Sequence, residues 1–175
     1  MIRTEDIKTL RGKTGASISE VRNALIAADG DTARALQILE RSLGERGSLK
    51  AERETRQGIV DCYVHSDKKI GVLVEILCET DFVARTSEFK ALVHDVALHI
   101  AAMNPLYIRK EDVPHEVMEA ERGLVDDLDK HFSEASLLTQ PFVKNPDKTV
   151  GEVLNEAAGK FGENIRVGRF VRFAI

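Results

Sequence analysis

Cysteine is scarce in this sequence. Only two cysteines, Cys62 and Cys78, occur among its 175 residues, and each lies within a run typical of a β-strand. Two isolated cysteines provide neither a secreted disulfide framework nor a cluster of metal ligands. We therefore expect both thiols to be reduced and buried, as in a cytoplasmic protein.

Long apolar runs are also missing. No apolar stretch reaches the roughly 20 residues that a membrane-spanning helix needs. The first residues, Met1–Asp6, carry acids and lack the apolar centre of a signal or transit peptide. The sequence therefore predicts a cytoplasmic location and no membrane partner.

A strongly basic charge balance is absent as well. The chain has 25 Lys and Arg against 29 Asp and Glu, a net charge of −4, which opposes bulk nucleic-acid binding. One alternative stays open near the C-terminus, where Arg166, Arg169, Arg172 and Phe170 are interspersed. A basic strand with an aromatic residue can stack bases, but charges also protect an edge strand from association. We expect no nucleic-acid partner.

The motifs of common enzyme classes are not present. There is no Gly-rich phosphate loop, paired-His metal motif or G-x-S-x-G elbow. Cys78, Asp81 and His99 could in principle form a thiol site, yet Cys78 continues an apolar strand pattern and fits inert packing. His65, His94 and His99 are spaced too widely to suggest a metal site. We expect no enzymatic activity, no cofactor and no metal.

The first 44 residues predict three short helices. Ser17–Glu20 has the spacing of a capping box, and Asp31 suits a helix N-cap. Such a bundle is similar to the ubiquitin-associated type of three-helix domain, which serves mainly for docking; the alternative is a helical cap on a larger domain. The apolar stripes of the three helices contain Ile7, Leu10, Ile18, Val21, Leu25, Ala35, Leu36, Leu39 and Leu43.

The remaining chain predicts a charged linker over 45–57 and an α+β core domain over 58–175. Period-two patterns predict three antiparallel strands near 58–65, 70–77 and 165–173, with Val60, Cys62 and Val64 on the buried face of the first. Helices that cover this sheet are expected at 87–103, at 114–130 and from Asp147 or Thr149 to 161. Residues 137–143 are expected to be extended, because Pro141 disfavours helix before it.

The most informative stretch is the end of the second strand, Glu75–Ala84. Thr80 and Asp81 can cap backbone N–H groups, which predicts a turn or a short helical start. Phe82 then lies at an element boundary, where functional side chains are often presented. The alternative is that Phe82 folds back into the core, which is the usual place for this residue type.

Several segments together resemble motifs of the elongation factor Ts family, and they occur in the same order and at similar separations along the chain. They are Leu10–Ala16, Glu79–Ala84, His99–Pro105, Leu138–Val143 with Thr149-Val150, and Arg169–Phe173. The resemblance implies a guanine-nucleotide exchange factor in translation that promotes GDP release from elongation factor Tu and so allows GTP to rebind.

The resemblance also implies roles for particular residues. Thr80, Asp81, Phe82 and Val83 would dislodge Mg²⁺ from elongation factor Tu. Arg11 and Ile18 would face the GTPase domain of that partner, and His99 would lie near the Phe82 wedge. Two alternatives stay open: Ile18 as bundle core and His99 as a packing histidine.

The chain resembles the short form of the family, which implies a symmetric homodimer. Residues 116–136 are brief even for that form. Val171 stands where short relatives can carry a cysteine, so no covalent dimer is expected from that strand. The competing hypothesis is a docking adaptor whose helical domain binds another protein while Phe82 is core.

Overall fold

The computed structural model describes residues 2–175 and divides into two compact units. The first comprises the chain up to Arg53 together with Leu154–Asn164. The second comprises Glu54–Val153 and Ile165–Ile175.

The first unit is helical. It contains α1 (Thr4–Thr14), α2 (Ile18–Ala27), α3 (Thr32–Ser48) and the C-terminal part of α8 (Val150–Phe161), from Leu154 on. The expected caps are confirmed: Ser17 and Glu20 form a capping box, and Asp31 caps α3. Helix α1 ends at Gly15, which is left-handed. The packed interior consists of Leu10, Ala16, Val21, Ala24, Leu25, Ala28, Ala35 and Leu39.

Two glycines allow α3 and α8 to approach closely. A Cβ on Gly47 would overlap the carbonyl oxygen of Asn155, and one on Gly159 would overlap that of Leu43. Only glycine fits where two backbones come this near. The C-terminal part of α8 is thus fixed against α3 within the first unit.

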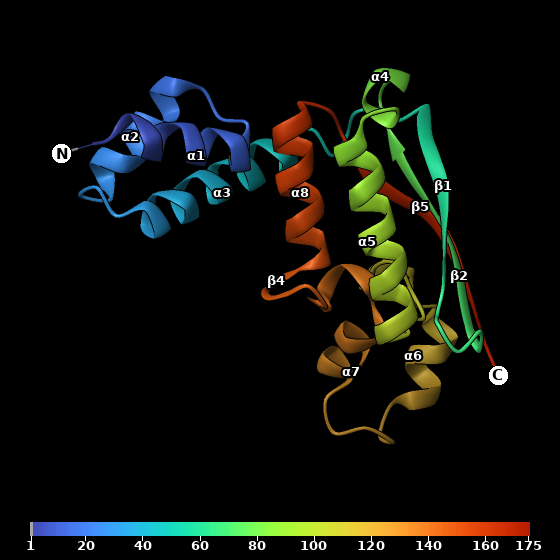
Figure 1. Ribbon diagram of the computed structural model, residues 1–175. Coiled ribbons are helices and arrows are strands. Elements are labelled where there is room, and N and C mark those ends of the chain that lie inside the picture. The colour runs from blue at the N-terminus through green and yellow to red at the C-terminus, as the bar shows by residue number, and fades with distance from the viewer. Residues whose placement is uncertain (1) are drawn as a thin grey trace. The chain divides into compact units, whose positions relative to one another are not determined.

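The second unit is built on a three-stranded antiparallel sheet in the order β1-β2-β5. The strands are β1 (Gln57–Val64), β2 (Ile70–Cys78) and β5 (Arg166–Ala174). Helix α5 (Ser87–Met103) runs across one face of this sheet, and the short α4 (Asp81–Ala84) lies at one end of α5 (Figure 1). This arrangement confirms the predicted α+β class.

The expected orientation of β1 is wrong. Val60, Cys62 and Val64 face outward and are exposed, whereas Asp61 and Tyr63 are half-buried on the side of α5. The register with β2 sets this orientation, because Asp61 and Tyr63 stand opposite the buried Val74 and Val72, and opposite residues of an antiparallel pair share one face. On that face Asp61 Oδ2 lies 3.3 Å from Nδ1 of His94 in α5. The expectation that both thiols are buried is therefore correct only for Cys78.

The segment between α5 and α8 departs most from the sequence-based expectation. The single helix expected over 114–130 is two helices, α6 (His115–Glu121) and α7 (Leu128–Ala135), because Gly123 takes a φ of 84° between them. Residues 137–139 form a 3-10 turn, η2 (Leu137–Thr139), rather than extended chain. A second 3-10 turn, η1 (Lys110–Asp112), precedes α6.

A two-stranded hairpin follows, and the sequence patterns did not reveal it. It pairs β3 (Pro141–Phe142) with β4 (Asn145–Thr149), so α8 starts at Val150 and not at Asp147. Thr149 and Glu152 bond reciprocally at that start, with Thr149 N–H donating to Glu152 Oε2 at 2.7 Å. None of the helices within residues 2–175 is long and apolar enough to cross a membrane.

Candidate partner-binding site

The residues Thr80–Val83 form a compact tip immediately after β2. Thr80 is the N-cap of α4, and its side chain accepts a hydrogen bond from Val83 N–H at 3.5 Å. At the other end, Thr86 Oγ1 donates to the carbonyl of Val83 at 2.9 Å and then caps α5 by accepting from Phe89 N–H. Threonines on both sides therefore fix a turn that is too short to be stable alone.

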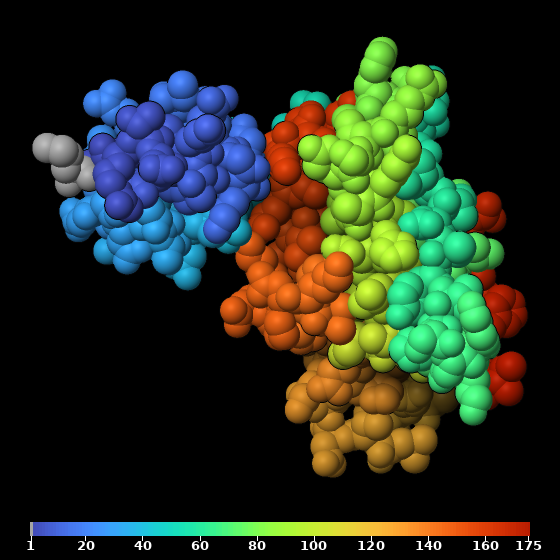
Figure 2. Space-filling view, viewed as in Figure 1, coloured from blue at the N-terminus to red at the C-terminus, as the bar shows by residue number. Residues whose placement is uncertain are grey.

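Successive side chains of this turn point in different directions. Neighbouring residues of a helix are rotated by about 100°, so Val83 is 9% exposed while Phe82 is 80% exposed. The interpretation of Phe82 as core is wrong. In Figure 2 the green segment that contains α4 stands out from the surface around it. The tip presents a bare aromatic ring on an anchored backbone.

Asp81 is held by a residue that the sequence reasoning missed. Arg85 Nη2 lies 2.8 Å from Asp81 Oδ2, one helical turn away. The i,i+4 spacing of an acid before a base is the signal that could have found this pair. Because both side chains are exposed, we expect the pair to orient the carboxylate rather than to add much stability.

Arg11 and Ile18 meet in one groove of the first unit. The groove has a volume of about 490 Å³ and lies between α1 and the start of α2. Arg11 Nε donates to the carbonyl of Ala16 at 3.3 Å, and Ile18 is 56% exposed. The interpretation of Ile18 as bundle core is therefore wrong. The groove is lined by Thr4, Ile7, Lys8, Arg11, Gly12, Gly15 and Ile18.

His99 lies apart from the tip. It follows Ser87 by 12 residues on α5, a rise of about 18 Å, so the expectation that it is near Phe82 is wrong. Its ring is fully buried and stacks on Phe142 of β3 with a centroid distance of 5.7 Å. This environment matches the alternative of a packing histidine.

The hydrogen bonds of His99 define its protonation. Nδ1 accepts from Val143 N–H at 3.2 Å, so Nε2 carries the proton and donates to Gln140 Oε1 at 3.0 Å. Burial lowers the pKa of His99 below its ordinary value of 6.5, and the bond to Gln140 only partly opposes this. The neutral ring thus ties the end of α5 to the β3–β4 hairpin.

No other chemistry is assembled around these residues. Cys78 is buried, and its Sγ donates to the Thr80 carbonyl at 3.2 Å. Within residues 2–175, no group of three or more His, Cys, Asp or Glu side chains is placed to hold a metal ion. The Phe82 ring of the tip and the Arg11–Ile18 groove are both open to solvent.

A model of the family described as Elongation factor TS matches residues 4–127 and 123–175. The chain belongs to the elongation factor Ts family. It is 44% identical to elongation factor Ts of Carboxydothermus hydrogenoformans over 194 residues, which cover all of this chain and 89% of the relative. The protein of that name from Thermosipho melanesiensis is 42% identical over 194 residues, with 100% and 99% covered.

Membership in the elongation factor Ts family makes this chain a translation elongation factor. The two matched stretches meet at residues 123–127, in the link between α6 and α7. The break between the two matches thus lies within residues 116–136, whereas the Thr80–Val83 tip lies inside the first match.

Proposed function

We propose that this protein promotes GDP release from elongation factor Tu, with Phe82 as the wedge. The observation that carries the proposal is the exposure of this aromatic ring on a turn capped at both ends. Burying a Phe side chain contributes a favourable free energy of about 1.5–3 kcal/mol. For Phe82 this contribution is realised only when another protein covers the ring.

The chemistry of the GTPase explains why a wedge is enough. GDP is held in such a site by P-loop amides, a lysine and a Mg²⁺ that bridges phosphate to protein. Mg²⁺ demands nearly ideal octahedral geometry, so a small displacement of the elements around it weakens the whole site. An aromatic ring can bury about 150–250 Å², enough to hold that displaced packing.

The other tip residues act through Phe82. Thr80 fixes the turn, Val83 anchors it in the core, and Asp81 places a carboxylate beside the ring. Asp81 repels the phosphate end of the nucleotide site, while Arg85 orients it. No covalent step is needed, so the protein acts as an exchange factor without enzymatic activity, cofactor or metal of its own.

The first unit supplies a second contact. We propose that the Arg11–Ile18 groove contacts the GTPase domain of elongation factor Tu, in the manner of a ubiquitin-associated docking domain. The groove joins an exposed isoleucine to the cations of Arg11 and Lys8, which suits an apolar surface with acidic neighbours. His99, being buried, contributes only by holding the β3–β4 hairpin in place.

The outward face of the sheet supports a homodimer. Register places Cys62, Leu73 and Val171 in one row across the three strands, and Val64, Gly71 and Phe173 in the next. All the apolar side chains of these rows are exposed. An apolar face of this extent fits a self-complementary interface between two copies, with both copies gripping the partner in the cytoplasm.

Stopped-flow release of a fluorescent GDP analogue from elongation factor Tu tests the proposed function. With millimolar Mg²⁺ we expect this protein to accelerate release strongly; with Mg²⁺ removed by EDTA, release is already fast and the added protein should change it little. Equal acceleration in both conditions would contradict the Mg²⁺ route. Binding without any acceleration would favour the docking adaptor instead.

A further inference from the structure

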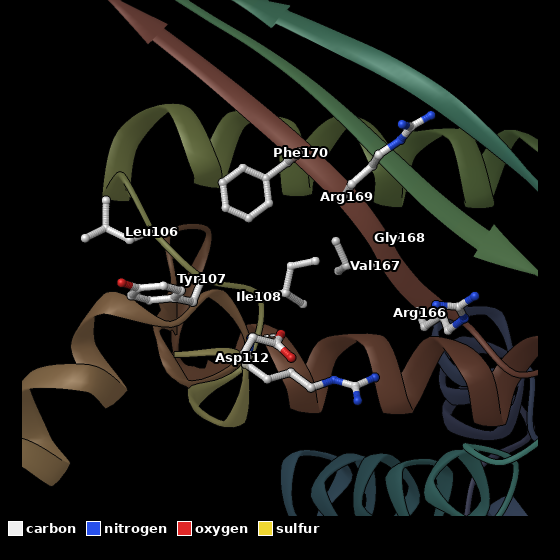
Figure 3. Close-up of a pocket in the computed structure, with 10 residues that line it drawn as sticks. Leu106, Tyr107, Ile108, Asp112, Arg166, Val167, Gly168, Arg169 and Phe170 are labelled. Carbon is white, nitrogen blue, oxygen red and sulfur yellow. Dashed lines mark hydrogen bonds between the residues drawn. The ribbon is translucent and has the colours of Figure 1, made fainter. Parts of the chain in front are cut away.

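A cleft in the second unit plays no part in the proposed function. It has a volume of about 530 Å³ and lies between the segment Leu106–Asp112 and residues 166–170 of β5 (Figure 3). Five residues of an extended strand span about 16 Å, so the cleft is as long as a short peptide. Its lining is Leu106, Tyr107, Ile108, Arg109, Asp112, Arg166, Val167, Gly168, Arg169 and Phe170.

The backbone beside this cleft is available for pairing. β5 pairs with β2 on one side only and is an edge strand. The segment on the opposite wall uses backbone groups for other bonds, because the carbonyls of Tyr107 and Ile108 accept from Leu137 N–H and Leu138 N–H at 2.9 and 3.0 Å. An unpaired strand edge is a template for an incoming extended segment.

The side chains make the cleft apolar at one end and basic at the other. Phe170 lies on the side of β5 that faces Leu106 and Tyr107, while Arg169 points to the other side (Figure 3). Arg166 Nε donates to Thr55 Oγ1 at 2.7 Å, and no carboxylate within residues 2–175 forms an ion pair with Arg109 or Arg166. Both guanidinium groups can therefore still bind anions.

We propose that this cleft binds a short, extended, acidic segment of a partner protein. The segment adds to the open edge of β5 by main-chain hydrogen bonds. Its apolar side chains lie against Phe170 and Leu106, and its carboxylates bind Arg109 and Arg166. Arginine suits this role because its planar group can bond a carboxylate through two parallel N–H donors.

Two features limit what can bind. The register of β2 with β5 shifts at Gly168, which interrupts the edge and restricts pairing to a short segment. The arginines repel basic strands and the β5 edge of a second copy, so they select an acidic partner. A nucleic acid has no peptide backbone to pair with this strand and would leave the edge unpaired.

The test uses the full chain and two fluorescein-labelled peptides. One peptide has glutamates at its N-terminal end and valines at the other, and the second has the reverse order. The two orders serve for a segment that pairs with β5 in either the parallel or the antiparallel direction. Fluorescence anisotropy should show binding of one of them. Lysines in place of the glutamates, or N-methylation of alternate backbone nitrogens, should abolish it. No binding of either glutamate peptide overturns the proposal.

Variants then locate the site. Arg109→Gln and Arg166→Gln should each weaken binding about tenfold, while Arg41→Gln, at an exposed arginine on α3, should leave it unchanged. Amides of residues 166–170 should shift in ¹⁵N spectra and gain protection from exchange. Two outcomes overturn the proposal. One is that the double variant Arg109→Gln/Arg166→Gln binds the peptide with unchanged affinity. The other is that the native chain binds single-stranded RNA more tightly than the peptide and that these variants lose the RNA binding. Phe82→Ala should bind the peptide normally, which separates this site from the exchange tip.

Discussion

At the scale of single residues, the tip depends on the contrast between Phe82 and its neighbour Val83. The first is 80% exposed and the second 9% exposed. Replacing Val83 with Ala removes buried methyl groups and leaves a cavity, whereas replacing Phe82 with Ala removes nothing from the interior. Substitution of Val83 should therefore lower the stability of the protein, and substitution of Phe82 should affect contact with a partner alone.

The buried ring of His99 predicts a pH-dependent stability. Its pKa is lowered by burial from the ordinary value of 6.5, so the unfolded chain binds more protons than the folded one just below that pH. The free energy of unfolding should be fully retained above pH 6.5 and should decline as pH falls from 6.5 toward the lower folded pKa. Urea unfolding at pH 7.5 and pH 5.5 measures this.

Two variants identify the source of that decline. His99→Gln should flatten the difference between the two pH values, while His115→Gln, at an exposed histidine of α6, should keep it. An unchanged difference in His99→Gln would show that other groups cause the decline.

Sequence reasoning at this scale located the tip but not its geometry. The Thr80-Asp81 pattern predicted a capped turn, and the structure has one. Whether Phe82 points in or out depends on how far β2 runs before the turn and on the packing of Val83, which are tertiary facts. The same limit applies to His99, whose buried partners Gln140 and Val143 are about 40 residues away.

At the scale of elements, the contact of α3 with α8 rests on glycine. Gly47→Ala should lower the free energy of unfolding by at least about 2 kcal/mol, because its Cβ would overlap the Asn155 carbonyl. Gly12→Ala is the matched control: a Cβ there meets nothing within 4 Å, so this change in α1 should stabilise by about 0.4–1 kcal/mol. Thermal and urea unfolding measure both, and equal effects would contradict the close contact.

Elements with strong local signals could be predicted from the sequence. The second and third helices carry their own N-caps, the first ends at a left-handed glycine, and the three strands of the sheet show a clear period of two. Periodicity does not tell which face is inside, and β1 is reversed because its register with β2 sets Asp61 and Tyr63 opposite the buried Val74 and Val72. The break at Gly123 was missed because a single glycine inside a helical pattern is often tolerated.

At the scale of the whole molecule, Cys62 reports on the proposed dimer. Cys62 lies exposed on the outward sheet face, on the edge strand β1, whereas Cys78 is buried. If two copies associate through this face, the rate at which a thiol reagent modifies Cys62 should fall as protein concentration rises through the dimerisation range. Ellman's reagent and sedimentation measure the rate and the dimer.

A Cys62→Ser variant should not react in the native state, which shows that the signal comes from one thiol. A modification rate that stays constant while sedimentation records a dimer would place the interface on another surface.

The most direct test of the account compares GDP release from elongation factor Tu in the presence of three proteins: the native chain, Phe82→Ala and Val83→Ala. The free energy of unfolding of Phe82→Ala should lie within about 0.5 kcal/mol of that of the native chain. Its acceleration of GDP release should nevertheless be at least about tenfold weaker. Val83→Ala should lose stability but, where folded, retain most of its activity. Release with Phe82→Ala that matches the native chain would contradict the claim that this exposed ring drives exchange.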